Sequence, residues 1–334
     1  MMNIHNCPSS LAEGYETYSP KSIKTLFGGL KVSHILDFNI DEFRNMGDVA
    51  AAMRRISVSG VQEKFPAVIE NGTIRISLDG ERSTYILKPA PWDQTLQARK
   101  QIPANEHLTM QIASQVYGIS TAANGLCFTE NGQMVYITKR FDILPDGTKS
   151  PMEDFASVIG KNEQENGKEF KYNGCYEDIA DAIKRYVPAW MVDMERFFDL
   201  VVFNYIYANG DDHLKNFSLI RQEQDYRLAP AYDLLNTSIH VNGDDFGLDG
   251  GLSPNIVRSD VYESTGHPCR LDFERFGELI GIKKPRVSRI LDRYMRLPES
   301  AETLIRLSFL NDKMKRYYQR IIQERLARFR RASE

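Results

Sequence analysis

The feature that most constrains the fold is a change of pattern near residue 142. Residues 54–142 hold short apolar runs rich in β-branched and aromatic residues, and Asn71-Gly72 and Asn131-Gly132 each separate two of them. Asn-Gly between such runs is a strong signal for a β-hairpin. Helical patterns dominate afterwards, including a long apolar segment at 193–210. The sequence therefore predicts an α+β protein, with a small antiparallel sheet lobe at 1–142 and a larger helical lobe at 143–334.

Composition narrows the class of protein. The 334-residue chain carries 42 lysines and arginines against 45 aspartates and glutamates, a formal net charge of −3, so it has no global attraction to nucleic acid. Its four cysteines form no CxxC pair, which indicates neither a disulfide framework nor a zinc site and is typical of a reducing compartment. We find no signal-peptide pattern and no apolar run near about 18 residues. We expect a cytoplasmic protein.

The densest polar motif is "NGDDHLKNFSL" at 209–219, between the long apolar helix and an apolar strand. Asp211, His213, Lys215 and Asn216 fall within it. Phosphoryl transfer needs a carboxylate to accept the proton of the nucleophile and an oxygen donor to hold Mg²⁺. The alternative is an Asn-Gly turn whose charged residues face solvent. We interpret the segment as a catalytic loop.

Two further residues have the chemistry for a nucleotide site. Asp233 ends the run "YRLAPAYDLLN", and one or two carboxylates with phosphate oxygens are what Mg²⁺ prefers; by itself, such an Asp is more often a turn or helix cap. Lys88 in "STYILKPA" can neutralise phosphates, or serve as an edge-strand lysine. Glu106 opens the next helix and can pair with Lys88, or simply favour the helix N-terminus.

The segment "ITKRFD" at 137–142 lies where strand gives way to helix. A hinge there can present backbone groups to adenine, with Phe141 as a stacking wall or as an ordinary core aromatic. The order is then a Ser/Gly loop, a Lys strand, a Glu helix, a hinge, a D-x-H-x-K-N loop and an Asp after a strand. This order matches a two-lobed protein-kinase-like (PI3/4-kinase-like) fold, although the chain has no GxGxxG, HRD or DFG motif.

The motifs "SGVQEK", "ILKP", "NE", "RFD", "NGDDHLKNFS" and "LAPAYDLL", over about residues 54–236, resemble the HipA family of serine/threonine kinases, the toxins of type II toxin–antitoxin modules. The resemblance implies ATP and Mg²⁺ as cofactors. It implies Asp211 as catalytic base with His213 and Asn216 beside it in the catalytic loop at 209–217, and Asn216 and Asp233 as metal ligands. The nucleotide-binding residues that it implies are Ser59, Gly60, Val61, Lys88, Lys139, Phe141 and Asp233.

The sheet pattern begins near residue 54, which leaves little room for the N-terminal subdomain of the usual HipA toxin. In this respect the chain resembles the short HipT branch of tripartite modules. The resemblance implies three partners: a helix-turn-helix antitoxin that binds DNA, a small third protein similar to the missing subdomain, and an aminoacyl-tRNA synthetase as substrate. The precedents are tryptophanyl- and glutamyl-tRNA synthetases, whose phosphorylation halts translation.

The stretch "ISVSGVQEK", residues 56–64, is the predicted phosphate loop. Ser57 and Ser59 are two apart, so in an extended loop their side chains lie on the same face, and backbone N–H groups around Gly60 can form an anion nest. The resemblance implies autophosphorylation of Ser57, Ser59 or both. A phosphoserine there would compete with ATP for the same donors. The alternative is a pair of ordinary strand-end serines.

The C-terminal segment 312–331 is amphipathic and basic. It can contact nucleic acid or a protein partner, or it can pack Tyr317, Ile321, Ile322 and Leu326 inward with a solvated basic face. Two other functions stay open for the whole chain. One is a kinase-shaped binding module acting in a repressor complex, and the other is a small-molecule kinase with a similar cleft.

Overall fold

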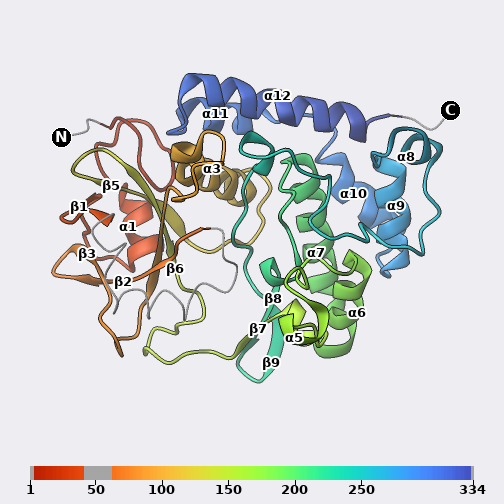
Figure 1. The fold of residues 1–334 in the computed structure, drawn as a ribbon, viewed down its shortest axis with the longest axis horizontal. Coiled ribbons are helices and arrows are strands. Elements are labelled where there is room, and N and C mark those ends of the chain that lie inside the picture. Colours follow the sequence, from red (N-terminus) through yellow and green to blue (C-terminus); the bar gives the residue numbers. More distant parts are fainter. Residues whose placement is uncertain (1–3, 41–61, 332–334) are drawn as a thin grey trace.

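The computed structural model describes residues 4–40 and 62–331. Within them, a β-sheet lobe formed by the N-terminal part of the chain lies beside a larger helical lobe (Figure 1). The predicted phosphate-loop residues Ser57, Ser59, Gly60 and Val61 lie outside the described residues.

The first lobe is built on one six-stranded sheet with the strand order β1-β5-β6-β4-β2-β3. β1 pairs parallel with β5, and the other neighbours are antiparallel. The strands are β1 Ile35–Leu36, β2 Phe65–Glu70, β3 Thr73–Ile76, β4 Tyr85–Pro89, β5 Asn124–Thr129 and β6 Met134–Lys139.

The two predicted hairpins are confirmed. Glu70 pairs directly with Thr73, which leaves Asn71 and Gly72 as a two-residue turn with φ of 51° and 79°. Positive φ at both positions is what the type I′ turn requires, and Asn and Gly tolerate it best. The second hairpin joins β5 to β6, with Gly132 at a φ of 76°.

A helix covers each face of this sheet. α1 (Pro20–Phe27) packs on Cys127, Val135 and Ile137, whereas α3 (Ile102–Gln115), which follows the 3₁₀ turn η2 (Arg99–Gln101), packs on Leu126 and Tyr136. Because side chains alternate between the faces of a strand, these two sets separate along β5 and β6. On β4, Leu87 joins the α1 face, and Lys88 therefore points to the α3 face.

The second lobe is mainly helical and carries a small antiparallel sheet of order β7-β8-β9. Its longest buried element, α7, combines five aromatic residues with Leu, Ile and Val, and most of its residues are buried, so it forms the centre of the lobe. The elements are β7 Met152–Asp154, α4 Phe155–Val158, α5 Glu163–Asn166, α6 Tyr176–Tyr186, α7 Trp190–Ile206, η3 Leu214–Asn216, β8 Ser218–Gln222, β9 Asp225–Leu228, η4 Thr237–Ile239, α8 Asp260–Thr265, α9 Arg270–Leu279, α10 Lys284–Asp292, α11 Glu299–Leu307 and α12 Asp312–Phe329.

The basic C-terminal helix α12 runs along one side of the molecule, over elements of both lobes (Figure 1). Ile321, Ile322 and Leu326 are buried, and Tyr317 packs against the core. Inward packing is thus confirmed for α12. Arg325 is also buried and pairs with Asp245, so part of the basic character of α12 is satisfied inside the protein. Among the described residues, no helix has the length and apolar character needed to span a membrane.

Candidate functional site

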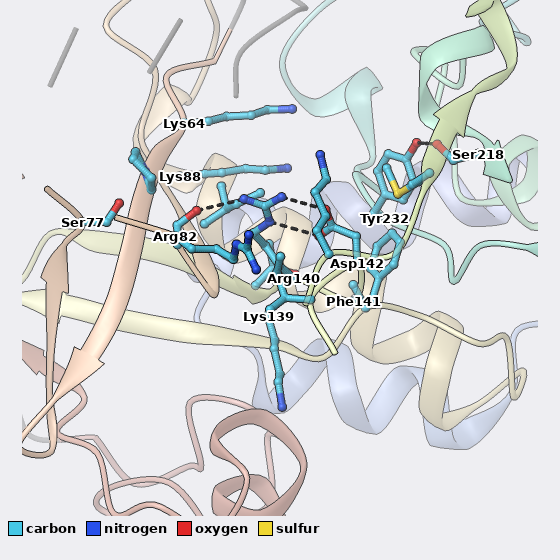
Figure 2. Close-up of a pocket in the computed structure, with 18 of the residues that line it drawn as sticks. Lys64, Ser77, Arg82, Lys88, Lys139, Arg140, Phe141, Asp142, Ser218 and Tyr232 are labelled. Atoms are coloured by element: carbon cyan, nitrogen blue, oxygen red, sulfur yellow. Dashed lines mark hydrogen bonds and ion pairs between the residues drawn. The ribbon is translucent and has the colours of Figure 1, made fainter. Parts of the chain in front are cut away.

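A cavity of about 770 Å³ lies between the lobes. Its walls come from the sheet lobe, from the segment that joins β6 to β7, and from the region of β7, η3, β8 and the segment after β9 in the helical lobe (Figure 2). The residues on which the site depends are Lys64, Ser83, Ile86, Lys88, Lys139, Arg140, Phe141, Asp142, Asp154, Lys215, Asn216, Tyr232 and Asp233.

Lys88 is the central cation of this cavity. Its side chain is only 3% exposed, and Nζ lies 2.6 Å from Oε1 of Glu106, which is 2% exposed. Nζ also pairs with Oδ1 of Asp233. Burial alone would lower the pKa of Lys88, but Asp233 and Glu106 outweigh burial and hold that pKa above its usual value. Of the two alternatives for Glu106, the structure shows the pair with Lys88. Strand β4 directs the Lys88 side chain toward α3, which carries Glu106.

Asp233 forms an ion pair with a second lysine, Lys64. Lys64 Nζ lies 3.1 Å from Oδ2 of Asp233, so each carboxylate oxygen faces one lysine. Burial would raise the pKa of Asp233, yet Lys64 and Lys88 hold that pKa below its usual range. The backbone of Asp233 has a φ of 57°, a left-handed conformation that is uncommon outside glycine and often occurs at functional sites.

Asp211 and Asn216 are joined by the turn that ends in η3. The Asn216 side chain donates Nδ2 to the backbone oxygen of Asp211 at 2.7 Å, and the backbone N–H of Asn216 donates to His213 O at 2.8 Å. With Nδ2 engaged inside the turn, the side-chain oxygen of Asn216 is available to the cavity that this residue lines. The catalytic-loop candidates therefore form one local structure.

His213 occupies the interior of that turn. Its ring is buried, and burial lowers the pKa of His213 to about 4, against a smaller opposing effect of Asp211. Nε2 lies 3.9 Å from Oδ1 of Asp211, which is too far for a hydrogen bond. A neutral, buried His213 therefore supports the shape of the loop by packing in its interior.

The neighbouring residue Asp212 anchors the loop to the segment before α8. Its carboxylate accepts hydrogen bonds from the Gly247 backbone N–H at 2.9 Å and from Asn204 Nδ2 at 3.0 Å. Burial raises the pKa of Asp212 to about 7. Lys215 makes a second tie from the loop: its Nζ lies 2.9 Å from Oδ2 of Asp154, which joins the loop to β7.

The segment after β6 forms the far wall of the cavity. Arg140 donates two hydrogen bonds to Asp142, from Nε to Oδ1 at 3.0 Å and from Nη2 to Oδ2 at 2.7 Å (Figure 2). Its Nη1 donates to Ser83 Oγ at 2.9 Å. The ring of Phe141 lies 5.8 Å from that of Tyr232, centroid to centroid. These two rings make an apolar wall of the kind that accepts a flat base.

The structure gathers most of the predicted residues but not all of them. Lys88, Phe141, Asn216 and Asp233 line one cavity, whereas Asp211 and His213 adjoin it through the loop. Lys139 lies at the edge of the cavity, but its side chain extends away from Lys64 and Lys88 (Figure 2). Since Thr138 faces the cavity, alternation along β6 turns the next side chain to the other face.

Sequence reasoning missed Lys64, Tyr232, the Arg140–Asp142 pair and Tyr172. Lys64 ends the predicted phosphate loop, so its place in the chain was a usable signal. Tyr232 immediately precedes Asp233 and could have been considered with it. Nothing in the local pattern marks Tyr172, which donates its hydroxyl to Asp211 Oδ1 at 2.9 Å.

Comparisons with known proteins find related sequences and related folds. A family model described as the HipA-like C-terminal domain matches residues 56–301. A Haemophilus influenzae protein named "Putative kinase" is 25% identical over 91% of this chain and 90% of its own length. "Putative kinase Y4mE" of Sinorhizobium fredii is 31% identical over 55% of this chain. The match covers 43% of the length of Y4mE, so this chain spans less than half of that relative.

Two solved structures share the fold. The HipA toxin of Shewanella oneidensis, solved with HipB and operator DNA, matches 81% of this chain and 64% of its own chain, with a TM-score of 0.60 and 18% identity. The Helicobacter pylori proinflammatory kinase CtkA matches 82% of this chain and 90% of its own, with a TM-score of 0.53 and 17% identity. The predicted two-lobed, kinase-like α+β fold is therefore confirmed.

Proposed function

The chain belongs to the HipA-like C-terminal domain family, and on this premise we propose that it is an ATP-dependent serine/threonine protein kinase that acts as a toxin. One observation carries the proposal. Two lysines and a carboxylate, Lys64, Lys88 and Asp233, meet at the cavity between the lobes, next to the loop that holds Asp211 and Asn216. Phosphoryl transfer depends on positioning and on charge stabilisation, and this set has the groups for both.

The residues present also fit a magnesium ion. Asn216 and Asp233 line the same cavity, and amide and carboxylate oxygens are ligands that Mg²⁺ accepts beside phosphate oxygens. A bound Mg²⁺ would neutralise the charge on the phosphates. With a nucleotide bound, Lys64 and Lys88 would be the cations that hold its phosphates, and Asp233, which pairs with both lysines in this structure, would be the carboxylate that holds the metal.

The remaining roles are part of the same proposal. Phe141 and Tyr232 flank the adenine, and the backbone of the 139–141 segment presents polar groups to it. Asp211 accepts the proton of the substrate hydroxyl, and His213 supports its loop. Under this proposal, Ser59, Gly60 and Val61 belong to the phosphate loop at 56–64. The lobe boundary falls at 142/143, at the end of the hinge.

The biological setting is the finer part of the proposal. The HipA structure from Shewanella oneidensis contains the antitoxin HipB and operator DNA, and this supports a DNA-binding antitoxin as a partner here. We further propose the HipT branch, a small third protein, cytoplasmic action, and a tryptophanyl- or glutamyl-tRNA synthetase as substrate. Ser57 and Ser59 would be autophosphorylated as regulation.

The second candidate function is a kinase-shaped binding module that only assembles a repressor complex. The pairing of both Lys64 and Lys88 with Asp233 is compatible with it, because such pairs also serve as structural ties. A pure scaffold, however, has no need for the half-exposed carboxylate of Asp211 at the edge of a charged cavity.

Transfer of labelled phosphate separates these functions. The full chain is incubated with Mg²⁺ and γ-labelled ATP, alone and with a panel of purified synthetases and small-molecule acceptors. The inactive controls are Asp211→Asn and Asp233→Asn, and Asp225→Asn, an exposed carboxylate on β9, is the matched active control. Label on one synthetase supports the toxin kinase. No transfer to any acceptor or to the chain itself, with ATP bound, supports the binding module. Intact-mass spectrometry with Ser57→Ala and Ser59→Ala variants tests the autophosphorylation sites.

A further inference from the structure

Tyr172 makes a direct side-chain contact with the carboxylate of Asp211. Its Oη donates to Oδ1 of Asp211 at 2.9 Å. The Asp211 side chain is 49% exposed, so packing alone does not fix its orientation. His213 Nε2 lies 3.9 Å from the same Oδ1 and makes no hydrogen bond to it.

Tyr172 is itself held firmly. The backbone N–H of Leu214 donates to Lys171 O, and that of Asp249 donates to Tyr172 O, both at 3.0 Å. The ring of Tyr172 meets the buried ring of His213 edge-on, with the centroids 5.1 Å apart and an angle of 70° between the planes. The segment before α6 is thus docked on the catalytic loop, and the hydroxyl has a defined position.

We propose that Tyr172 is a positioning residue for phosphoryl transfer: it holds one oxygen of Asp211, so that the other oxygen faces the hydroxyl of the protein substrate. The inference rests on the proposed kinase function. A general base must lie within hydrogen-bond reach of the proton that it accepts, and a freely rotating aspartate meets this condition only part of the time. Tyr172 reduces that rotational freedom before the substrate arrives.

A tyrosine suits this role better than a cation does. A lysine or arginine at the same place would form a salt bridge with Asp211 and draw its negative charge away from the substrate hydroxyl. The phenol is neutral and stays protonated, because burial and the adjacent Asp211 carboxylate raise the pKa of Tyr172 well above its usual value. It can therefore orient the base while leaving its charge in place.

Tyr172→Phe removes the hydroxyl and keeps the ring, and Tyr186→Phe is the matched control because Tyr186 is exposed. We expect kcat for phosphoryl transfer to fall about 10- to 100-fold in Tyr172→Phe, since misplacement of a catalytic group by about 1 Å costs on that scale. The KM for ATP should stay within twofold of the wild-type value, and the thermal midpoint should stay within about 2 °C of it. A kcat within twofold of the wild type would overturn the proposal, and so would a higher kcat, which would indicate an inhibitory contact.

A second readout does not depend on activity. In protein labelled with ¹³Cζ-tyrosine, the Tyr172 resonance is the one lost in Tyr172→Phe. We expect this resonance to move in Asp211→Ala and to stay in place in Asp225→Ala. A resonance that does not move in Asp211→Ala would disprove the contact. If the wild-type chain transfers no phosphate while the resonance does move, the proposed function fails and the contact between Tyr172 and Asp211 stands.

Discussion

Lys88 Nζ lies 2.6 Å from Glu106 Oε1, and both side chains are almost completely buried. This pair fixes β4 to α3 and aims the remaining hydrogen-bonding capacity of Lys88 at Asp233. The same lysine thus contributes both to the stability of the sheet lobe and to the charge in the cavity. A change at Lys88 should therefore affect two measurements.

We expect Lys88→Met to weaken ATP binding at least tenfold and to reduce phosphoryl transfer at least 100-fold, because the main cation for the phosphates is lost. Leaving one charge of a buried pair without its partner costs about 3–5 kcal/mol. Burial raises the pKa of Glu106, so Glu106 can take up a proton instead, and we expect a stability loss of about 3 kcal/mol or less. Calorimetric titration with ATP and urea unfolding measure the two effects. Lys100→Met, at an exposed lysine, is the control, and equal ATP affinity of both variants would contradict the prediction.

Phe141→Ala tests the adenine wall. Removal of the ring that faces Tyr232 should raise the KM for ATP about 5- to 20-fold, because a base-stacking surface worth about 1–2 kcal/mol is lost. The kcat should change less than threefold, since the proposed role of Phe141 is to bind the base and not to take part in phosphoryl transfer. Steady-state kinetics with ATP as the varied substrate provide the measurement. The control is Leu144→Ala, at an exposed residue outside the cavity lining, which should keep the wild-type KM for ATP. A wild-type KM in Phe141→Ala as well would show that Phe141 does not bind the adenine.

Gly247→Ala tests the anchor of the catalytic loop. A Cβ at Gly247 would lie 2.5 Å from the backbone N of Asp212, so the loop must shift or the chain must strain. Overpacking of this kind typically costs about 1–3 kcal/mol. We expect the variant to lose at least tenfold in transfer activity and to unfold at a lower temperature. Gly243→Ala is the control in the same segment, because its Cβ meets only Thr237 Oγ1, at 3.9 Å; equal melting temperatures of the two variants would show that the contact is unimportant.

The buried His107 predicts a pH dependence of stability. Burial lowers the pKa of His107 to about 4, despite the opposing hydrogen bond to Ser9 O. Between pH 6.5 and 4 the unfolded chain binds a proton at this residue that the folded chain does not, so stability rises with pH across this window and falls as the pH drops. In His107→Gln we expect the slope of unfolding free energy against pH to be shallower by up to about 1.4 kcal/mol per pH unit. Urea unfolding at several pH values checks this difference, and parallel slopes would refute it.

Local patterns in the sequence determined the two lobes, the two Asn-Gly hairpins and the grouping of Asp211, His213 and Asn216. These depend on periodicity and turn chemistry within about 20 residues. The Lys88–Glu106 pair was one of two alternatives that the sequence offered for Glu106, because a strand and the helix that follows it are usually adjacent in space; the structure decided between them.

Only the tertiary structure decided which distant groups meet. Lys64 reaches Asp233 across 169 residues, and Tyr172 reaches Asp211 across 39. In the tertiary structure the Lys139 side chain also extends away from Lys64 and Lys88 (Figure 2). Arg325 of the basic helix pairs with Asp245. Residues so far apart come together through the packing of whole elements, and the local order of side chains does not encode that packing.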